Sequence, residues 1–202
     1  MISSPYRSVK PENWLKITNR LLNKFPLDRN DIVNIVLESW DDIFHTKIGA
    51  RKYIIGRDIH PQPQIMSFLL HEMIPLNLAF RFPDIWKRGE GSEFDSVYMP
   101  DDKYSFEIKA SSSTKDIYGN RSYTKTGENS QKRRSGYFLA INFDKFHVTA
   151  LKSVITLVRF GWLDADDWIG QKAASGQQAR LTKEAKAYKL IVLMDKSGKR
   201  QL

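Results

Sequence analysis

The sequence predicts an α/β or α+β fold in which a central mixed β-sheet is flanked by helices. Two observations support this prediction. The first 80 residues repeat apolar side chains at helical spacing, whereas residues 94–150 contain short apolar runs with the alternation of strands. Residues 151–202 mix both patterns. Because the 202 residues contain no internal repeat, low-complexity tract or linker, we expect one domain built from these three parts.

Three helices are predicted in the first part. Residues 11–25 and 28–46 carry apolar residues near i, i+3, i+4 and i+7, and Asp28 or Asn30 can cap the second helix. Residues 64–80 have the length and apolar content of a buried helix. The second helix has an apolar stripe that predicts either a core face or a dimer face, formed by Ile32, Ile35, Val36, Trp40 and Ile43.

The remaining parts supply the predicted sheet. Residues 136–151 are expected to form a hairpin that turns near Asp144 and Lys145. Polar residues 164–181 interrupt the C-terminal part. The other predicted strands cover residues 96–100, 104–110 and 187–194, and the C-terminal part also contains an apolar segment at residues 153–163.

Composition narrows the possible functions. No apolar run approaches the roughly 20 residues that a membrane span needs, and the N-terminus lacks the apolar segment of a signal peptide, so we expect a cytoplasmic protein without a membrane partner. The chain has no cysteine, which excludes disulfides, thiolate zinc sites and cysteine nucleophiles. Its 32 Lys and Arg against 23 Asp and Glu give a formal charge of +9, which favours a nucleic-acid partner.

One strand carries a possible catalytic site. Alternation within residues 104–110 places Glu107 and Lys109 on the same face. If the chain turns back at residues 100–103, antiparallel pairing sets Asp95 opposite Glu107 or Ile108. Cross-strand neighbours lie about 5 Å apart, so two carboxylates there can share a hard cation. We predict Mg²⁺, bound by Asp95, Glu107 and Ile108.

Such a site could hydrolyse a phosphodiester. A metal held by two carboxylates stabilises negative charge and lowers the pKa of a bound water, which Lys109 would orient or help to deprotonate. Glu72 is a fourth candidate, because a carboxylate within an apolar helix is costly unless it is used. The alternatives are a solvated Glu107–Lys109 ion pair and an exposed Glu72.

A long polar and basic segment follows this strand. Residues 111–136 combine cations, hydroxyls, amides and tyrosines, which suit phosphate and base contacts, although a solvated loop would have a similar composition. Glutamines near residue 178 could contact adenine or form a polar turn. The predicted DNA-binding residues are Ser111, Ser112, Ser113, Asn120, Arg121, Ser122, Tyr123, Lys125, Lys132, Arg133, Gln177, Gln178 and Arg180.

Histidines 45, 60, 71 and 147 are scattered, with no spacing typical of a metal site. We expect them to be core or surface residues rather than ligands.

The spacing of Asp95, Glu107 and Lys109 resembles the PD-(D/E)xK nuclease motif, with Phe94 in place of the proline. A literal Pro83–Asp84 lies too far upstream to be preferred. Beyond the motif, three segments resemble the ScaI-like group of type II restriction endonucleases: residues 47–75, 105–123 and 158–181.

The resemblance implies a restriction-endonuclease-like core and a bacterial, homodimeric, Mg²⁺-dependent enzyme that cuts both strands of a short palindrome, with blunt ends. A glutamate from a neighbouring helix, as proposed for Glu72, also occurs in this superfamily. A cognate DNA methyltransferase is implied as well, without physical association. Two alternatives stay open: a non-catalytic DNA-binding protein and a structure-specific repair nuclease. The target sequence is not predicted.

Overall fold

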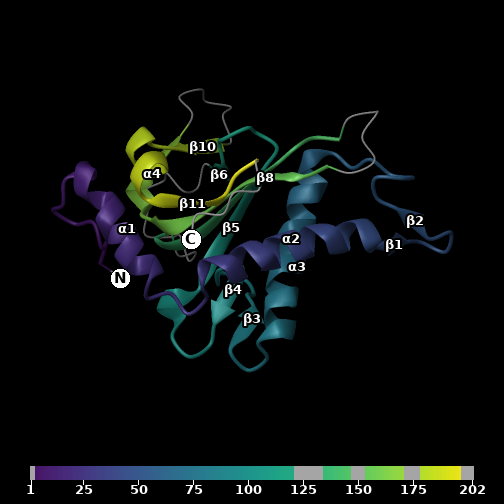
Figure 1. Cartoon of the computed structure of the whole chain (residues 1–202), viewed down its shortest axis with the longest axis horizontal. Coiled ribbons are helices and arrows are strands. Elements are labelled where there is room, and N and C mark those ends of the chain that lie inside the picture. The colour runs from purple at the N-terminus through teal and green to yellow at the C-terminus, as the bar shows by residue number, and fades with distance from the viewer. Residues whose placement is uncertain (1–2, 121–133, 147–152, 171–177, 197–202) are drawn as a thin grey trace.

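The computed structural model of the protein describes residues 3–120, 134–146, 153–170 and 178–196. Its centre is a six-stranded mixed sheet in the order β11-β8-β7-β5-β4-β3, in which β5 and β7 run parallel and the other neighbours antiparallel (Figure 1). The predicted mixed central sheet is therefore confirmed. Its strands are β3 (Trp86–Arg88), β4 (Ser96–Tyr98), β5 (Phe106–Ser111), β7 (Gly136–Phe143), β8 (Ile155–Leu163) and β11 (Leu190–Met194).

Helices cover one face of this sheet. They are η1 (Pro11–Asn13), α1 (Trp14–Leu22), α2 (Arg29–His45) and α3 (Pro63–Arg81). The side chain of Asp28 accepts a hydrogen bond from the Asp31 amide at 2.8 Å, so Asp28 is the N-cap of α2. All five residues of the predicted α2 stripe are buried in the main hydrophobic cluster. Of the two predicted roles for that stripe, the core face is the correct one.

α3 is buried on one side only. Met66, Leu70, Ile74 and Leu78 face the core, whereas the apolar side chains on the opposite side are exposed. The expectation of a buried helix is wrong for this second face, because a helix that is apolar on every side gives no signal of which side packs.

A smaller layer covers the other face of the central sheet. It contains the three-stranded sheet β6 (Tyr118–Asn120), β10 (Gln178–Leu181) and β9 (Trp168–Gly170), preceded by η4 (Ala165–Asp167) and followed by α4 (Lys183–Tyr188). Its apolar residues form a second cluster with Phe138, Ala140 and Leu163 of the central strands. A short hairpin, β1 (Lys47–Ile48) and β2 (Tyr53–Ile54), joins α2 to α3 and projects from the body (Figure 1).

The strand register decides which side chains meet. Ser96 pairs with Phe106, which confirms the predicted β4–β5 register. The turn predicted near Asp144 and Lys145 follows the end of β7, but the predicted return strand, most of which lies outside the described residues, is not the partner of β7. β7 pairs instead with β8 from Ile155 onward, because this second segment is a longer apolar run that can be buried on both faces.

No helix in the described part of the chain is both long and apolar enough to cross a membrane.

Candidate active site

The β4–β5 ribbon brings three of the predicted residues together. Asp95 immediately precedes β4, and its Oδ2 accepts a hydrogen bond from the Ile108 amide of β5 at 2.7 Å. On β5 itself, Lys109 lies two residues after Glu107, and Lys109 Nζ donates a hydrogen bond to Glu107 Oε1 at 2.7 Å. The electrostatic interaction between Lys109 and Asp95 links the two halves of this group.

Gly89 allows the segment before β4 to pass close to the end of β3. The Gly89 amide donates to the Asp95 carbonyl at 2.9 Å, where the segment before β4 lies against β3. A Cβ atom at residue 89 would lie 1.7 Å from the Phe94 carbonyl oxygen, so a larger residue would push Asp95 away from β5.

The Glu107–Lys109 pair is not a solvated surface pair. Phe106 and Ile108 point into the main core, while Glu107 and Lys109 point to the opposite face, as alternation predicted. The side chains of Glu107 and Lys109 are only 1% and 13% exposed. Burying a carboxylate this deeply is costly without a cationic partner, and Lys109 provides one.

The surroundings of Asp95 keep it ionised. Burial alone would raise its pKa, but His71, Lys109 and the Ile108 amide more than compensate, so the pKa of Asp95 lies below its usual value. An ionised carboxylate at neutral pH is what a hard divalent cation requires.

His71 of α3 is a neighbour that sequence reasoning missed. Its Nδ1 lies 3.3 Å from Asp95 Oδ2. The neighbouring Glu72, which was the predicted residue on this helix, pairs with Arg88 of β3 at 2.8 Å. One helical step of about 100° separates the two side chains, and only the packing of α3 decides which of them meets Asp95.

The donor set suits magnesium. Asp95, Glu107 and the Ile108 carbonyl would supply hard oxygen ligands, and Mg²⁺ commonly binds through one or two carboxylates and keeps several waters. Within the described residues, no group of three or more His, Cys, Asp or Glu side chains could hold a metal ion. Glu72 and His71 therefore do not complete a three-side-chain metal site with the two carboxylates.

The chain that leaves β5 is anchored by a residue that was not predicted. Asn142 of β7 donates through Nδ2 to the carbonyls of Ser113 and Asp116 at 2.8 and 3.0 Å. Arg159 of β8 holds this amide in turn by donating to Asn142 Oδ1 at 2.7 Å. The sequence signal was a lone amide in the apolar strand at residues 136–143. This anchor fixes the backbone around Ser111, Ser112 and Ser113.

The structure also places some of the predicted DNA-binding residues. Gln178 and Arg180 are exposed on β10, opposite Asn120 and Tyr118 of β6. The Arg180 guanidinium lies over the Tyr118 ring, 5.8 Å from its centroid. Strands β6 and β10 thus bring together two segments about 60 residues apart in the sequence. The predicted residues Arg121, Ser122, Tyr123, Lys125, Lys132, Arg133 and Gln177 lie outside the described residues.

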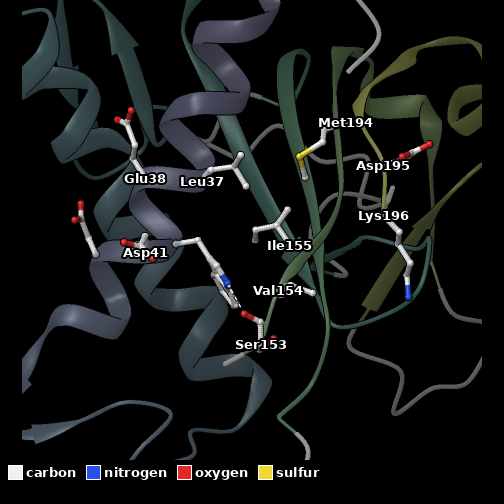
Figure 2. A pocket seen from close by; sticks show the side chains of 11 residues that line it. Leu37, Glu38, Asp41, Ser153, Val154, Ile155, Met194, Asp195 and Lys196 are labelled. Carbon is white, nitrogen blue, oxygen red and sulfur yellow. Dashed lines mark hydrogen bonds between the residues drawn. The ribbon is translucent and has the colours of Figure 1, made fainter. Parts of the chain in front are cut away.

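A separate pocket of about 560 Å³ opens between α2 and the ends of β8 and β11. Figure 2 shows Glu38 and Asp41 on its helical side and Ser153 on the opposite side. Trp40 closes it by donating to the Ser153 carbonyl at 2.9 Å. None of the predicted site residues lines this pocket, so it is distinct from the site on the β4–β5 ribbon.

A mixed sheet that presents an aspartate beside a Glu-x-Lys pair, with helices on one face, is typical of nucleases of the restriction-endonuclease-like class. Comparison with known proteins agrees. The ScaI restriction endonuclease family model matches residues 4–194. The type II restriction enzyme ScaI of Streptomyces caespitosus is 42% identical over 181 residues, which cover 88% of this chain and 79% of that enzyme. The chain belongs to the ScaI restriction endonuclease family, and the predicted type II restriction endonuclease is thereby confirmed.

Proposed function

We propose that this enzyme is a Mg²⁺-dependent endonuclease that hydrolyses one phosphodiester in each strand of a short palindromic DNA sequence, and that Asp95, Glu107 and Lys109 form its catalytic site. The observation that carries the proposal is the ribbon that holds Asp95 against Ile108 beside the buried Glu107–Lys109 pair. Family membership supports DNA as the substrate.

Each residue has a distinct role in this proposal. Asp95, Glu107 and the Ile108 carbonyl would bind the metal, which when present supplies Lewis-acid stabilisation and a more acidic water. Asp95 accepts a hydrogen bond from the Ile108 amide through Oδ2, so Oδ1 would be the oxygen offered to the metal. Lys109, oriented by Glu107, would place its ammonium group against the attacking water and the scissile phosphate.

DNA binding is assigned to the surface beyond the end of β5. We propose that the serines at residues 111–113 and the basic loop at residues 120–133 contact the backbone, and that Gln178 and Arg180 contribute from β10. The exposed positions of Gln178 and Arg180 beside β6 support this assignment. The chain's excess of 9 positive charges fits a polyanionic substrate.

Cutting two strands requires two sites, so we propose a homodimer whose two-fold axis matches that of the palindrome. The whole chain would form one domain and act in the bacterial cytoplasm. A methyltransferase acting separately would protect the host DNA.

The direct test is digestion of phage DNA with and without Mg²⁺, followed by sequencing of the ends. Discrete fragments that share one terminal sequence are expected, with no product from Glu107→Ala. A smear would indicate a structure-specific nuclease. Salt-sensitive binding without cleavage would indicate a non-catalytic DNA-binding protein.

A further inference from the structure

The outer face of α3 exposes more apolar surface than a solvent-facing helix normally does. Phe80 is 90% exposed, and three further large side chains on this face are about half exposed. The α3 stripe, as we call it, consists of Ile65 (52% exposed), Phe68 (58%), Leu76 (49%) and Phe80. Isolated exposed apolar residues are common, but a continuous row along one helix marks an interaction surface.

The stripe is nearly symmetric about its centre. Phe68 and Leu76 lie four residues before and after Glu72, while Ile65 and Phe80 lie seven and eight residues from it. Two antiparallel copies of α3, related by a two-fold axis at Glu72, would place Phe68 against the partner's Leu76. The same axis would place Ile65 against the partner's Phe80. Such self-complementarity is the condition for an isologous interface.

The charge at the centre of the stripe is already compensated. On a two-fold axis Glu72 would approach its own copy, and two like charges there would repel. Arg88 of the adjacent strand β3 contacts both carboxylate oxygens of Glu72, at 3.0 and 2.8 Å. Each subunit would therefore bring a neutral pair to the axis.

The size of the stripe also fits a dimer contact. From Ile65 to Phe80 it is roughly 22 Å long at 1.5 Å per residue. Taking about 150–200 Å² for each large side chain, the exposed fractions amount to roughly 400–500 Å² per copy. A standard interface buries about 800 Å² per partner, so the stripe would supply its apolar core, with polar surroundings completing it.

We propose that the α3 stripe packs antiparallel against the α3 stripe of a second copy of this chain, about a two-fold axis at Glu72. This inference rests on the proposed homodimer and names its interface. The inner side of α3 contacts the candidate active site: His71 lies beside Asp95, and Ser67 Oγ donates to the Ala110 carbonyl at 3.2 Å. The same helix would then set the distance between the two catalytic sites.

The first experiment measures mass in solution by sedimentation velocity. The wild-type chain should sediment at about twice its 23.5 kDa, and Leu76→Glu/Phe80→Glu should sediment as a monomer. The control is Ile169→Glu, which places a glutamate on a 58% exposed apolar residue of β9, away from α3, and should stay dimeric. Far-UV circular dichroism checks that each variant is folded. A dimeric Leu76→Glu/Phe80→Glu would overturn the interface.

The second experiment tests the register and uses the absence of cysteine. Glu72→Cys should form a dimer with a short bismaleimide, because its two copies would face each other on the axis. Phe80→Cys should not, because its two copies would lie roughly 24 Å apart along the helix pair. Cross-linking of residue 80 without residue 72 would overturn the proposed axis.

The two proposals fail in different ways. The interface is overturned and the proposed function is supported if the wild-type enzyme cleaves DNA as a dimer, Leu76→Glu/Phe80→Glu is also a dimer, and Glu72→Cys does not cross-link. A monomeric wild-type chain overturns the homodimer and this interface together.

Discussion

Among the described residues, two buried lysine–carboxylate groups can be compared, and they differ in how far they are open to solvent. Lys109 lies with Glu107 on β5, an interior strand of the central sheet. Lys189 lies just before the edge strand β11 and contacts Asp164 and Asp167, each at 2.8 Å. Both groups are well shielded from solvent, so burial and pairing alone do not distinguish a catalytic site from a structural one.

The surroundings of the two lysines make the distinction. The ammonium group of Lys189 also lies 4.3 Å from the ring centroids of Tyr6 and Trp14, so that cation–π contacts complete a closed cluster. Burial raises the pKa of Asp167 in this cluster despite the nearby Lys189. Asp95, near Lys109, has a lowered pKa and is more exposed. A closed ion cluster joins distant parts of the chain, whereas a partly open one keeps a carboxylate ionised and within reach of a ligand.

The largest expected effect separates the two groups by activity. Glu107→Gln keeps the shape of the side chain but removes the charge needed for the metal, so DNA cleavage should fall by about 10³-fold, or roughly 4 kcal/mol in activation free energy. Stability without metal should fall by about 1–3 kcal/mol, less than for the Lys189 cluster, because Asp95 remains as a second carboxylate that interacts with Lys109. Single-turnover cleavage and urea unfolding measure the two quantities. Cleavage at the wild-type rate would remove Glu107 from the catalytic site.

The second prediction reverses this pattern. Lys189→Met leaves Asp164 and Asp167 buried without their cation, so the free energy of unfolding should fall by about 3–5 kcal/mol. The cleavage rate per folded molecule should not change. Lys186→Met is the control, because its pair with Asp116 is about one-third exposed and should contribute about 1 kcal/mol or less. Equal losses in the two variants would contradict the closed-cluster interpretation.

A third prediction tests how Asp95 is held. His71→Ala removes the neighbour at 3.3 Å, and the loss of such a supporting contact typically costs about 10–100-fold in activity or metal affinity. Cleavage and the Mg²⁺-induced shift in melting temperature should both decrease, and His71→Asn should restore part of each. His45→Ala, at an exposed histidine, is the control. If Glu72→Gln proved more damaging than His71→Ala, the prediction of Glu72 as a site residue would be supported instead.

The smallest expected effect concerns acid stability without metal. The folded-state pKa of Asp95 is below its unfolded value of about 3.9, so its contribution is fully present above that pH and is lost as the pH falls through the folded pKa. Wild type should lose more stability than Asp95→Asn between about pH 5 and about pH 2 in urea titrations. Asp167, whose pKa is raised, contributes in the opposite sense, because stability is lost as the pH rises toward its folded pKa. Parallel pH profiles for Asp95→Asn and wild type would contradict the lowered pKa.

Local patterns made much of the candidate site predictable. Strand alternation fixes the shared face of Glu107 and Lys109, and the short turn between β4 and β5 fixes the register that brings Asp95 to Ile108. These relations involve residues fewer than 15 positions apart in the sequence.

Long-range packing explains what could not be predicted. His71 is 24 residues from Asp95, and choosing it over Glu72 depends on the rotation of α3 about its own axis. The return strand after β7 was misplaced because two apolar segments competed to pair with it. The Lys189 cluster joins residues on separate elements with no periodic signal.

The anchor formed by Asn142 holds the segment after β5 against the central sheet's own strands. It ties the backbone at Ser113 and Asp116 to the central sheet, and β6 is then paired with β10, before the basic residues 121–133. We therefore expect substitutions or length changes in residues 121–133 to leave the position of β5 unchanged. Laboratory selection for a new target sequence could randomise residues 121–133 while the candidate active site keeps its shape.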